Sequence, residues 1–196
     1  MVDGWEPPKR QPMRKYSPAV TAAIEQELKE QLAAGILEPS DAPSGSPVHM
    51  VVKPSSASGY RFCVDFSELN KSVVSESFPL PNIQTILEWA GSCSKIKGKL
   101  DLRSGYWQFP VAPEDRHKLA VQVLGKVYQY CVVPMGHVDS AFHVQRVMDA
   151  EFGNLIGKGL FVYLDDLFLY AQTISEFVTI LREVLTILRR CGLKCR

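Results

Sequence analysis

The order of apolar patterns along this sequence predicts an α+β fold, in which helices cover an antiparallel sheet. Helix-like stripes, with apolar residues every three or four positions, are interspersed with short strand-like runs. The sharpest local feature spans residues 160–170, where two strongly apolar strands flank two adjacent aspartates. No internal repeat or low-complexity tract interrupts this order, so a layered α+β domain is favoured.

The first predicted elements are an arm and a helix. Residues 1–16 are rich in Pro, Lys and Arg and lack apolar periodicity, so they predict an extended basic arm. Ser17 can cap the helix that follows, and Pro18 suits its first turn. Apolar residues then recur every four positions until Gly35 offers a stop. This stripe gives the helix one face to bury.

The rest of the chain alternates between strand-like and helix-like segments. Strands are recognised by short runs of β-branched and aromatic residues between turn signals, and helices by apolar residues at a longer period. We expect strands at residues 48–53, 60–66 and 97–102, two strands within 119–133 and two within 160–170. We expect helices at residues 83–90, 140–152 and 175–190.

The bulk composition excludes several classes of protein. With 46% hydrophobic and 22% charged residues, the 196-residue chain is neither disordered nor collagen-like. Its five cysteines are scattered and odd in number, so mostly reduced, buried thiols are expected, as in intracellular proteins. No stretch approaches the roughly 20 apolar residues of a membrane span, and the N-terminus lacks the apolar centre of a secretory signal. We therefore expect a soluble, intracellular protein.

The acidic pair Asp165 and Asp166 calls for a compensating interaction. Adjacent carboxylates between apolar strands repel each other and lose solvation. One interpretation is a solvated hairpin turn, because Asp is common in turns. The other is a cation site, since Mg²⁺ prefers oxygen ligands and two ions about 4 Å apart can stabilise an in-line phosphoryl displacement. Asp101, at the end of another predicted strand and shortly before Gly105, would be the third ligand.

Two short motifs containing these acids resemble the motifs of a known family. Residues 163–166 read Tyr-Leu-Asp-Asp, and residues 99–106 read Lys-Leu-Asp-Leu-Arg-Ser-Gly-Tyr. They resemble the YxDD motif and the first catalytic motif of reverse transcriptases, in particular those of gypsy-type long-terminal-repeat retrotransposons. Further segments resemble the same group in order and spacing, namely residues 17–47, 60–71, 78–81 and 111–115.

The resemblance implies the fingers and palm of a right-hand polymerase, with an antiparallel palm sheet covered by helices. After the arm, residues 17–96 would form mainly the fingers and residues 97–196 mainly the palm with the Tyr-Leu-Asp-Asp hairpin, and the boundary would be interleaved. Family members continue into a thumb and a ribonuclease H domain. We therefore expect the thumb to be absent from these 196 residues.

The resemblance also implies an activity, RNA-directed DNA polymerisation. Asp101, Asp165 and Asp166 would bind two Mg²⁺ ions, or Mn²⁺ in their place, and a deoxynucleotide (dNTP) would be transferred onto a primer 3′-hydroxyl. The partners would be an RNA or DNA template with its primer, the dNTP, and the missing thumb and ribonuclease H portions or a larger protein assembly.

Five further residues would bind substrate by the same resemblance. Tyr106 would be the aromatic gate under the sugar, and Arg61 would contact the triphosphate. Lys53 is a weaker candidate for similar work, and an ordinary exposed charge is the alternative for both cations. Met135 and Gln145 belong to the segment that shapes the nucleotide pocket and the template contact.

That segment also motivates a second hypothesis. Pro134, Gly136, Ser140 and Gln145 stand where the family has them, whereas the neighbouring Leu, Pro and Phe positions are altered. The net charge is only +1 at pH 7, so a nucleic-acid surface would need its basic residues concentrated in a groove. The alternative is a weak or inactive retroelement-derived domain that serves as a structural or interaction subunit of a larger complex.

Overall fold

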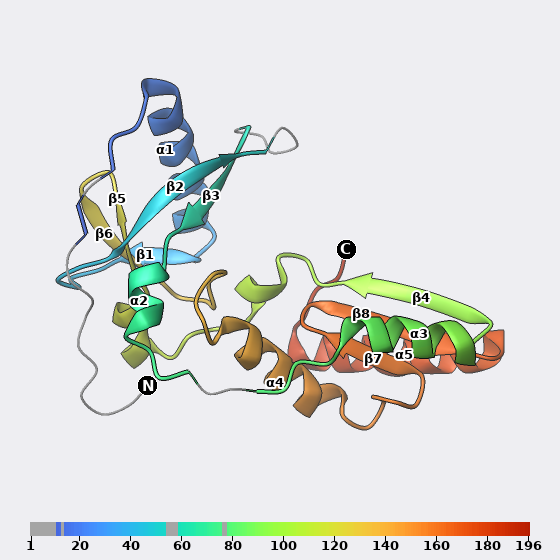
Figure 1. Cartoon of the computed structure of the whole chain (residues 1–196). Coiled ribbons are helices and arrows are strands. Elements are labelled where there is room, and N and C mark those ends of the chain that lie inside the picture. The colour runs from blue at the N-terminus through green and yellow to red at the C-terminus, as the bar shows by residue number, and fades with distance from the viewer. Residues whose placement is uncertain (1–10, 13, 54–58, 76–77) are drawn as a thin grey trace. The chain divides into compact units, whose positions relative to one another are not determined.

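The computed structural model describes residues 11–12, 14–53, 59–75 and 78–196. Most of the predicted arm lies outside these described residues, and so do most of residues 54–59, whose Pro, Ser and Gly residues favour a turn. The chain forms two compact units, each with its own sheet (Figure 1). Unit 1 comprises Met1–Ser75 and Phe109–Ser140, and unit 2 comprises Glu76–Gln108 and Ala141–Arg196.

Unit 1 is built on a five-stranded sheet in the order β1-β6-β5-β2-β3. The strands are β1 (Leu37–Pro39), β2 (Ser46–Val52), β3 (Tyr60–Val64), β5 (Ala120–Val123) and β6 (Lys126–Tyr130). Neighbouring strands are antiparallel except β2 and β5, which run parallel. The strands predicted at residues 48–53 and 60–66 are confirmed as β2 and β3, which pair in antiparallel register.

Helices cover the sheet of unit 1. Helix α1 (Pro18–Ala33) begins where the sequence predicts, and its Ser17 hydroxyl accepts a hydrogen bond from the Val20 N–H at 3.4 Å. Its Ile24 is fully buried. The unit also contains α2 (Ser67–Lys71) and the 3₁₀-helix Pro113–Leu119. Apolar side chains from both helices and strands form one core, which includes Ile24, Leu37, Val48, Phe66, Leu69, Val121 and Tyr130.

Unit 2 is built on a three-stranded antiparallel sheet in the order β4-β8-β7. The strands are β4 (Ile96–Asp101), β7 (Leu160–Tyr163) and β8 (Asp166–Ala171). Side chains alternate between the two faces of a sheet, and directly opposed residues share a face. One face therefore carries the fully buried Leu160, Leu167 and Leu169, and the opposite face carries the acids at the strand ends.

Helix α5 (Ile174–Cys191) covers the apolar face of this sheet. Its N-terminus has a capping box, in which Thr173 and Glu176 each accept a hydrogen bond from the other's backbone N–H. Its Phe177 lies against Gly98 of β4, and Ile180 lies against Gly159 just before β7. Unit 2 also contains α3 (Ile83–Cys93), the 3₁₀-helix Gly105–Gln108 and all but the first residue of α4 (Ser140–Phe152).

The predicted α+β class is confirmed, and so are the predicted helices and strands within one to three residues at their ends. The sequence did not predict β1, α2 or the two 3₁₀-helices, which are too short to show a period. It predicted antiparallel pairing, which holds throughout unit 2 but not for β2 and β5 of unit 1. Assignment of the units to fingers and palm stays a prediction. Among the described residues, every helix is too short or too polar to cross a lipid bilayer.

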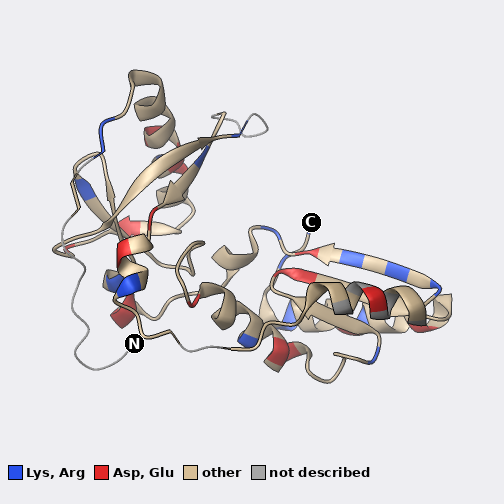
Figure 2. Ribbon diagram, viewed as in Figure 1, with Lys and Arg blue, Asp and Glu red and all other residues tan. Residues whose placement is uncertain are grey.

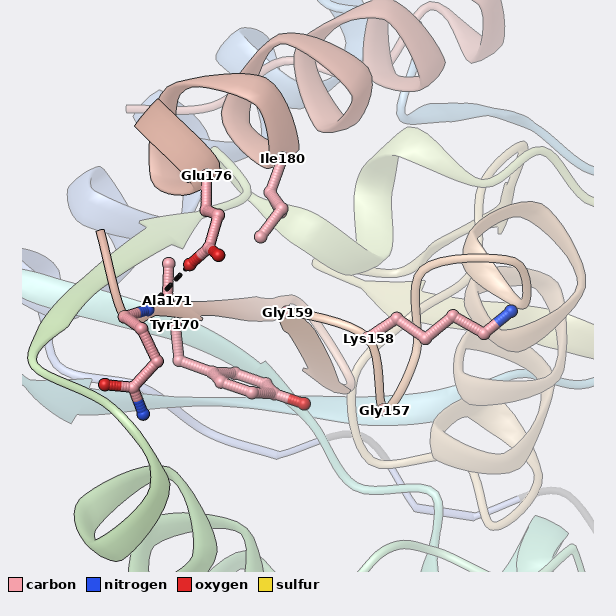
Figure 3. A pocket seen from close by; sticks show the side chains of 8 residues that line it. Gly157, Lys158, Gly159, Tyr170, Ala171, Glu176 and Ile180 are labelled. Atoms are coloured by element: carbon pink, nitrogen blue, oxygen red, sulfur yellow. Dashed lines mark hydrogen bonds between the residues drawn. The ribbon is translucent and has the colours of Figure 1, made fainter. Parts of the chain in front are cut away.

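Two glycines of one loop offer a test of the packing between α5 and the sheet (Figure 3). Gly159 has φ +111°, and a Cβ there would collide with Ile180 and lie 3.3 Å from the Tyr170 carbonyl oxygen. We expect Gly159→Ala to lower the free energy of unfolding by roughly 2–4 kcal/mol, through backbone strain and overpacking. Urea unfolding followed by circular dichroism measures this change.

Gly157→Ala is the matched control for this prediction. Gly157 also has a positive φ, +79°, but a Cβ there meets nothing within 4 Å. The strain alone should cost about 1 kcal/mol. Equal losses in the two variants would show that Ile180 does not restrict this loop.

Candidate active site

The antiparallel ladder brings Asp101 to the acidic pair. Asp101 is the last residue of β4, Asp166 is the first residue of β8, and the two are directly opposed. Asp165 lies in the turn between β7 and β8, and its carbonyl oxygen accepts a hydrogen bond from the Leu102 N–H at 3.0 Å. Three carboxylates, one of them distant in sequence, therefore meet at one end of the sheet. Figure 2 shows acidic residues at these strand ends and basic residues along β4.

The turn that carries the acids is strained and supported from behind. Leu164 has φ +54°, a left-handed conformation that costs about 1–2 kcal/mol in a residue other than glycine. Gln145 of α4 is fully buried, and its side-chain oxygen accepts a hydrogen bond from the Leu164 N–H at 2.7 Å. Its amide nitrogen donates to the Val162 carbonyl at 3.2 Å and to Asp149 at 2.8 Å. Gln145 thereby holds the end of β7 and the first residue of the turn in place.

Gly105 lets the next segment approach the acids closely. A Cβ at this position would collide with the Asp165 side chain and lie 2.8 Å from its Oδ2. The absence of a side chain at Gly105 therefore allows the close approach of the Asp165 side chain. Tyr106 is consequently held near the acids. Burial raises the pKa of its phenol, and the nearby Asp165 carboxylate and Tyr163 add to the rise.

The charges of the site partly compensate one another. Burial raises the pKa of Asp165, and the neighbouring carboxylates of Asp166 and Asp101 raise it further, while a backbone hydrogen bond and Lys99 act against the rise. The Lys99 Nζ lies 2.8 Å from Oδ2 of Asp166, and this hydrogen bond raises the pKa of Lys99. An exposed guanidinium, that of Arg196, lies 3.6 Å from Asp101.

The donor chemistry of the site fits a hard divalent cation. Magnesium prefers oxygen ligands and is usually bound by one or two carboxylates together with substrate phosphates. Within the described part of the chain, no three His, Cys, Asp or Glu side chains lie in an arrangement that could already hold a metal ion. Two of the acids are instead paired with Lys99 and Arg196. The three acids therefore share one place, but their oxygens do not form a finished ligand set.

The predicted substrate-binding residues are divided between the two units. Tyr106 and Gln145 belong to unit 2, as do the three acids. Arg61, Lys53 and Met135 belong to unit 1. Arg61 is exposed on β3, Lys53 is partly buried just after β2, and the Met135 side chain is 58% exposed.

Two features of the site were missed at the level of sequence. Lys99 stands two residues before Asp101, so strand alternation places both on one face, and this spacing was a usable signal. The strained φ of Leu164 was not foreseeable, because leucine is not a residue that favours the left-handed region.

Comparison with known proteins assigns the chain to a family. Residues 51–196 match the family described as reverse transcriptase (RNA-dependent DNA polymerase). The chain belongs to the reverse transcriptase family. The retrovirus-related Pol polyprotein of the Drosophila melanogaster transposon gypsy is 33% identical to it over 163 residues. The transposon Tf2-3 polyprotein of Schizosaccharomyces pombe is 32% identical over 191 residues.

These reverse transcriptase relatives are much longer than the chain. The match covers 81% of this chain but 16% of the gypsy polyprotein, and 94% of this chain but 14% of the Tf2-3 polyprotein. The resemblance stated from the motifs is confirmed at the level of the family. The roles of individual residues stay predictions.

Solved reverse transcriptases have the same fold. The native protease-reverse transcriptase of prototype foamy virus has a TM-score of 0.86 and 27% identity, and the match covers 99% of this chain and 26% of the viral chain. A foamy viral protease-reverse transcriptase in complex with an RNA/DNA hybrid has a TM-score of 0.84 at 23% identity, over 98% of this chain and 25% of that chain. The fingers and palm architecture is thus supported for this chain.

Gln145→Leu tests the support of the turn. The change keeps the side-chain volume but leaves the Leu164 N–H and the Val162 carbonyl without their buried partner. We expect a loss of about 1–3 kcal/mol in the free energy of unfolding, measured in urea. Gln84→Leu, at an exposed position of α3, should change it by less than about 0.5 kcal/mol. Similar effects of both variants would contradict the role of Gln145.

Proposed function

We propose that this chain is the catalytic core of an RNA-directed DNA polymerase, in which Asp101, Asp165 and Asp166 bind two Mg²⁺ ions. The observation that carries the proposal is the register that pairs Asp101 with Asp166 beside the Asp165 turn. Membership of the reverse transcriptase family supports it. So do relatives that are Pol polyproteins of transposons and a structural neighbour solved with an RNA/DNA hybrid. The substrates would be a dNTP and a primer on an RNA or DNA template.

The proposed chemistry depends mostly on position and charge. When bound, the ions would lower the pKa of the primer 3′-hydroxyl and stabilise the leaving pyrophosphate, with Mn²⁺ able to replace Mg²⁺. The chain's part is to hold the acids at fixed positions. Asp101 and Asp166 come from two paired strands, and Asp165 is held by the turn and by the close approach of Gly105. Rigid placement of this kind avoids reorganisation during the reaction.

The other predicted residues receive different roles in this proposal. Tyr106 is half-buried near Asp165, and its ring would exclude a 2′-hydroxyl from the sugar position. Arg61 is exposed and would bind the triphosphate through its planar guanidinium, and Lys53 would assist more weakly. Met135, also exposed, would line the nucleotide pocket. Because Gln145 is fully buried and bonds to the turn, we assign it to positioning the acids and not to substrate contact.

Replacing the acids one at a time tests the proposed activity. We expect Asp101→Asn, Asp165→Asn and Asp166→Asn each to lower dNTP incorporation on a poly(rA) template with an oligo(dT) primer and Mg²⁺. The loss should be about 10²-fold or more, because each change removes a charged ligand from the transition-state environment. Asp41→Asn, at an exposed position of unit 1, is the matched control and should leave the rate unchanged. Equal incorporation by the wild type and Asp101→Asn would refute the proposal.

Substitution of Tyr106 tests the predicted gate. Tyr106→Ala removes the ring that would meet a 2′-hydroxyl, so ribonucleotide incorporation relative to dNTP should rise by about 10-fold or more. Tyr106→Phe keeps the ring and should preserve the discrimination. Competition between a dNTP and its ribonucleotide in single-nucleotide extension measures the ratio. An unchanged ratio in Tyr106→Ala would assign the gate to another residue.

A second candidate function is a structural subunit with little or no catalysis. It is favoured by one observation, that the exposed Met135 stands in the segment 134–145 that departs from the family pattern. Wild-type protein would then give no incorporation and bind no primer-template duplex, and it would purify at fixed stoichiometry within a complex. Salt-dependent binding of the duplex by the isolated chain would argue against this candidate.

A further inference from the structure

Three charged residues alternate along β4. Lys97, Lys99 and Asp101 are two positions apart, so their side chains leave the same face of the strand. Their surroundings differ. The Lys97 ammonium donates a hydrogen bond to the Gly91 carbonyl at 3.3 Å, whereas the Lys99 ammonium reaches the acidic site.

Lys99 has two partners on β8. Its Nζ lies 2.8 Å from Oδ2 of Asp166 and 5.5 Å from the centroid of the Phe168 ring. Asp166 and Phe168 are also two positions apart, so the carboxylate and the ring face the ammonium from one side of the sheet. The Lys99 side chain is 50% exposed and that of Asp166 is 21% exposed, so the pair is open to solvent and to ions.

The Lys99–Asp166 ion pair reduces the repulsion between the carboxylates of the site. Three neighbouring carboxylates would repel one another without a nearby positive charge. The Lys99 ammonium supplies one, and it occupies an oxygen of Asp166 that a divalent cation would need. A divalent cation bound to that oxygen would therefore compete with the ammonium. Arg196 is less suited to this role, because it is 72% exposed and lies 3.6 Å from Asp101.

We propose that Lys99 is a built-in counter-ion of the acidic site, which neutralises Asp166 before a divalent cation binds and is displaced from it when the cation arrives. The Phe168 ring offers the released ammonium a favourable position, since a cation within about 6 Å of an aromatic centroid is attracted to its face. Lys99 is thus a positioning residue that keeps Asp166 in place in the metal-free chain. The inference rests on the proposed function, because it takes Asp101, Asp165 and Asp166 as the ligands.

Cation binding to three lysine variants tests the inference. Lys99→Met keeps the length of the side chain and removes its charge, so Mn²⁺, followed by the electron paramagnetic resonance signal of the free ion, should bind about two- to fivefold more tightly. Lys97→Met removes the same charge from the same face of β4 and should change the affinity by less than about twofold, as a distant exposed charge is screened. Lys99→Arg keeps the charge and should restore the wild-type affinity.

Thermal unfolding gives a second readout that does not depend on catalysis. Without metal, Lys99→Met should melt below the wild type, because Asp166 loses its counter-ion. Saturating Mn²⁺ should then raise its melting temperature by more than it raises that of the wild type, since a ligand that binds the folded state more tightly stabilises it more. If Lys99 had only a structural role, Lys99→Met would lower the melting temperature by the same amount with and without Mn²⁺.

The outcomes separate this inference from the proposed function. If wild-type chain binds Mn²⁺, Asp165→Asn abolishes that binding and Lys99→Met binds no more tightly than wild type, the counter-ion role is wrong and the metal site stands. Equal tightening by Lys97→Met would also overturn the role, because it would reflect net charge alone. If neither the wild type nor Lys99→Met binds Mn²⁺ in a manner that Asp165→Asn removes, the metal site and the counter-ion both fail.

Discussion

The pairing of Asp101 with Asp166 in the β4–β8 ladder is the constraint on which the rest of unit 2 depends. An antiparallel register with a period of two fixes the face of every side chain, so the same ladder that opposes two acids also aligns the leucines beneath them. Leu167 and Leu169 are buried on the other face and covered by α5. Burial of each contributes roughly 1.5–3 kcal/mol, which can offset the repulsion between acids that share the strand ends. A shift of one residue in the strand register would turn the leucines towards solvent and the acids towards the core. It would therefore lose both the buried apolar contacts and the pairing of the acids.

Around this pairing, the turn combines strain with support. Leu164 in the left-handed region is an unfavourable arrangement taken alone, and the close approach of Asp165 is possible only because residue 105 is glycine. Gln145 counteracts this strain, because its buried amide bonds to the Leu164 N–H and to the Val162 carbonyl just before the turn. Local strain that is maintained by surrounding hydrogen bonds is typical of sites where side chains must be held in one orientation. The strained turn and the buried Gln145 side chain therefore act together to fix the orientation of the acids.

Much of this architecture could be predicted from the sequence, and what escaped prediction has physical reasons. The helix from Pro18 is predicted by its capping residue and its apolar periodicity. The two strands at residues 160–170 are predicted by their long apolar runs. Strand β1 has three residues and owes its existence to pairing with β6, which no local pattern encodes. Asp101 was linked to the acidic pair by its place at a strand end and by the motif resemblance, but its distance to the pair could not be predicted, since 64 positions separate it from Asp165. The bonds of Gln145 and Lys99 depend on tertiary neighbours, so they became visible only with the register in place.

The charges at the strand ends also suggest why such a site would bind metal and substrate together. Three carboxylates beside two cationic side chains leave one net negative charge, which would attract a first divalent ion. A second divalent ion would give the acidic site a large positive charge unless anions bound with it. A nucleotide triphosphate is an anion of the required charge. Release of Lys99 from Asp166 would remove one positive charge from the site, but two divalent ions would still leave an excess of positive charge that a triphosphate can neutralise. The local balance of charge would therefore favour coupled binding, in which one ion would bind to the chain alone and the second would bind with the phosphates.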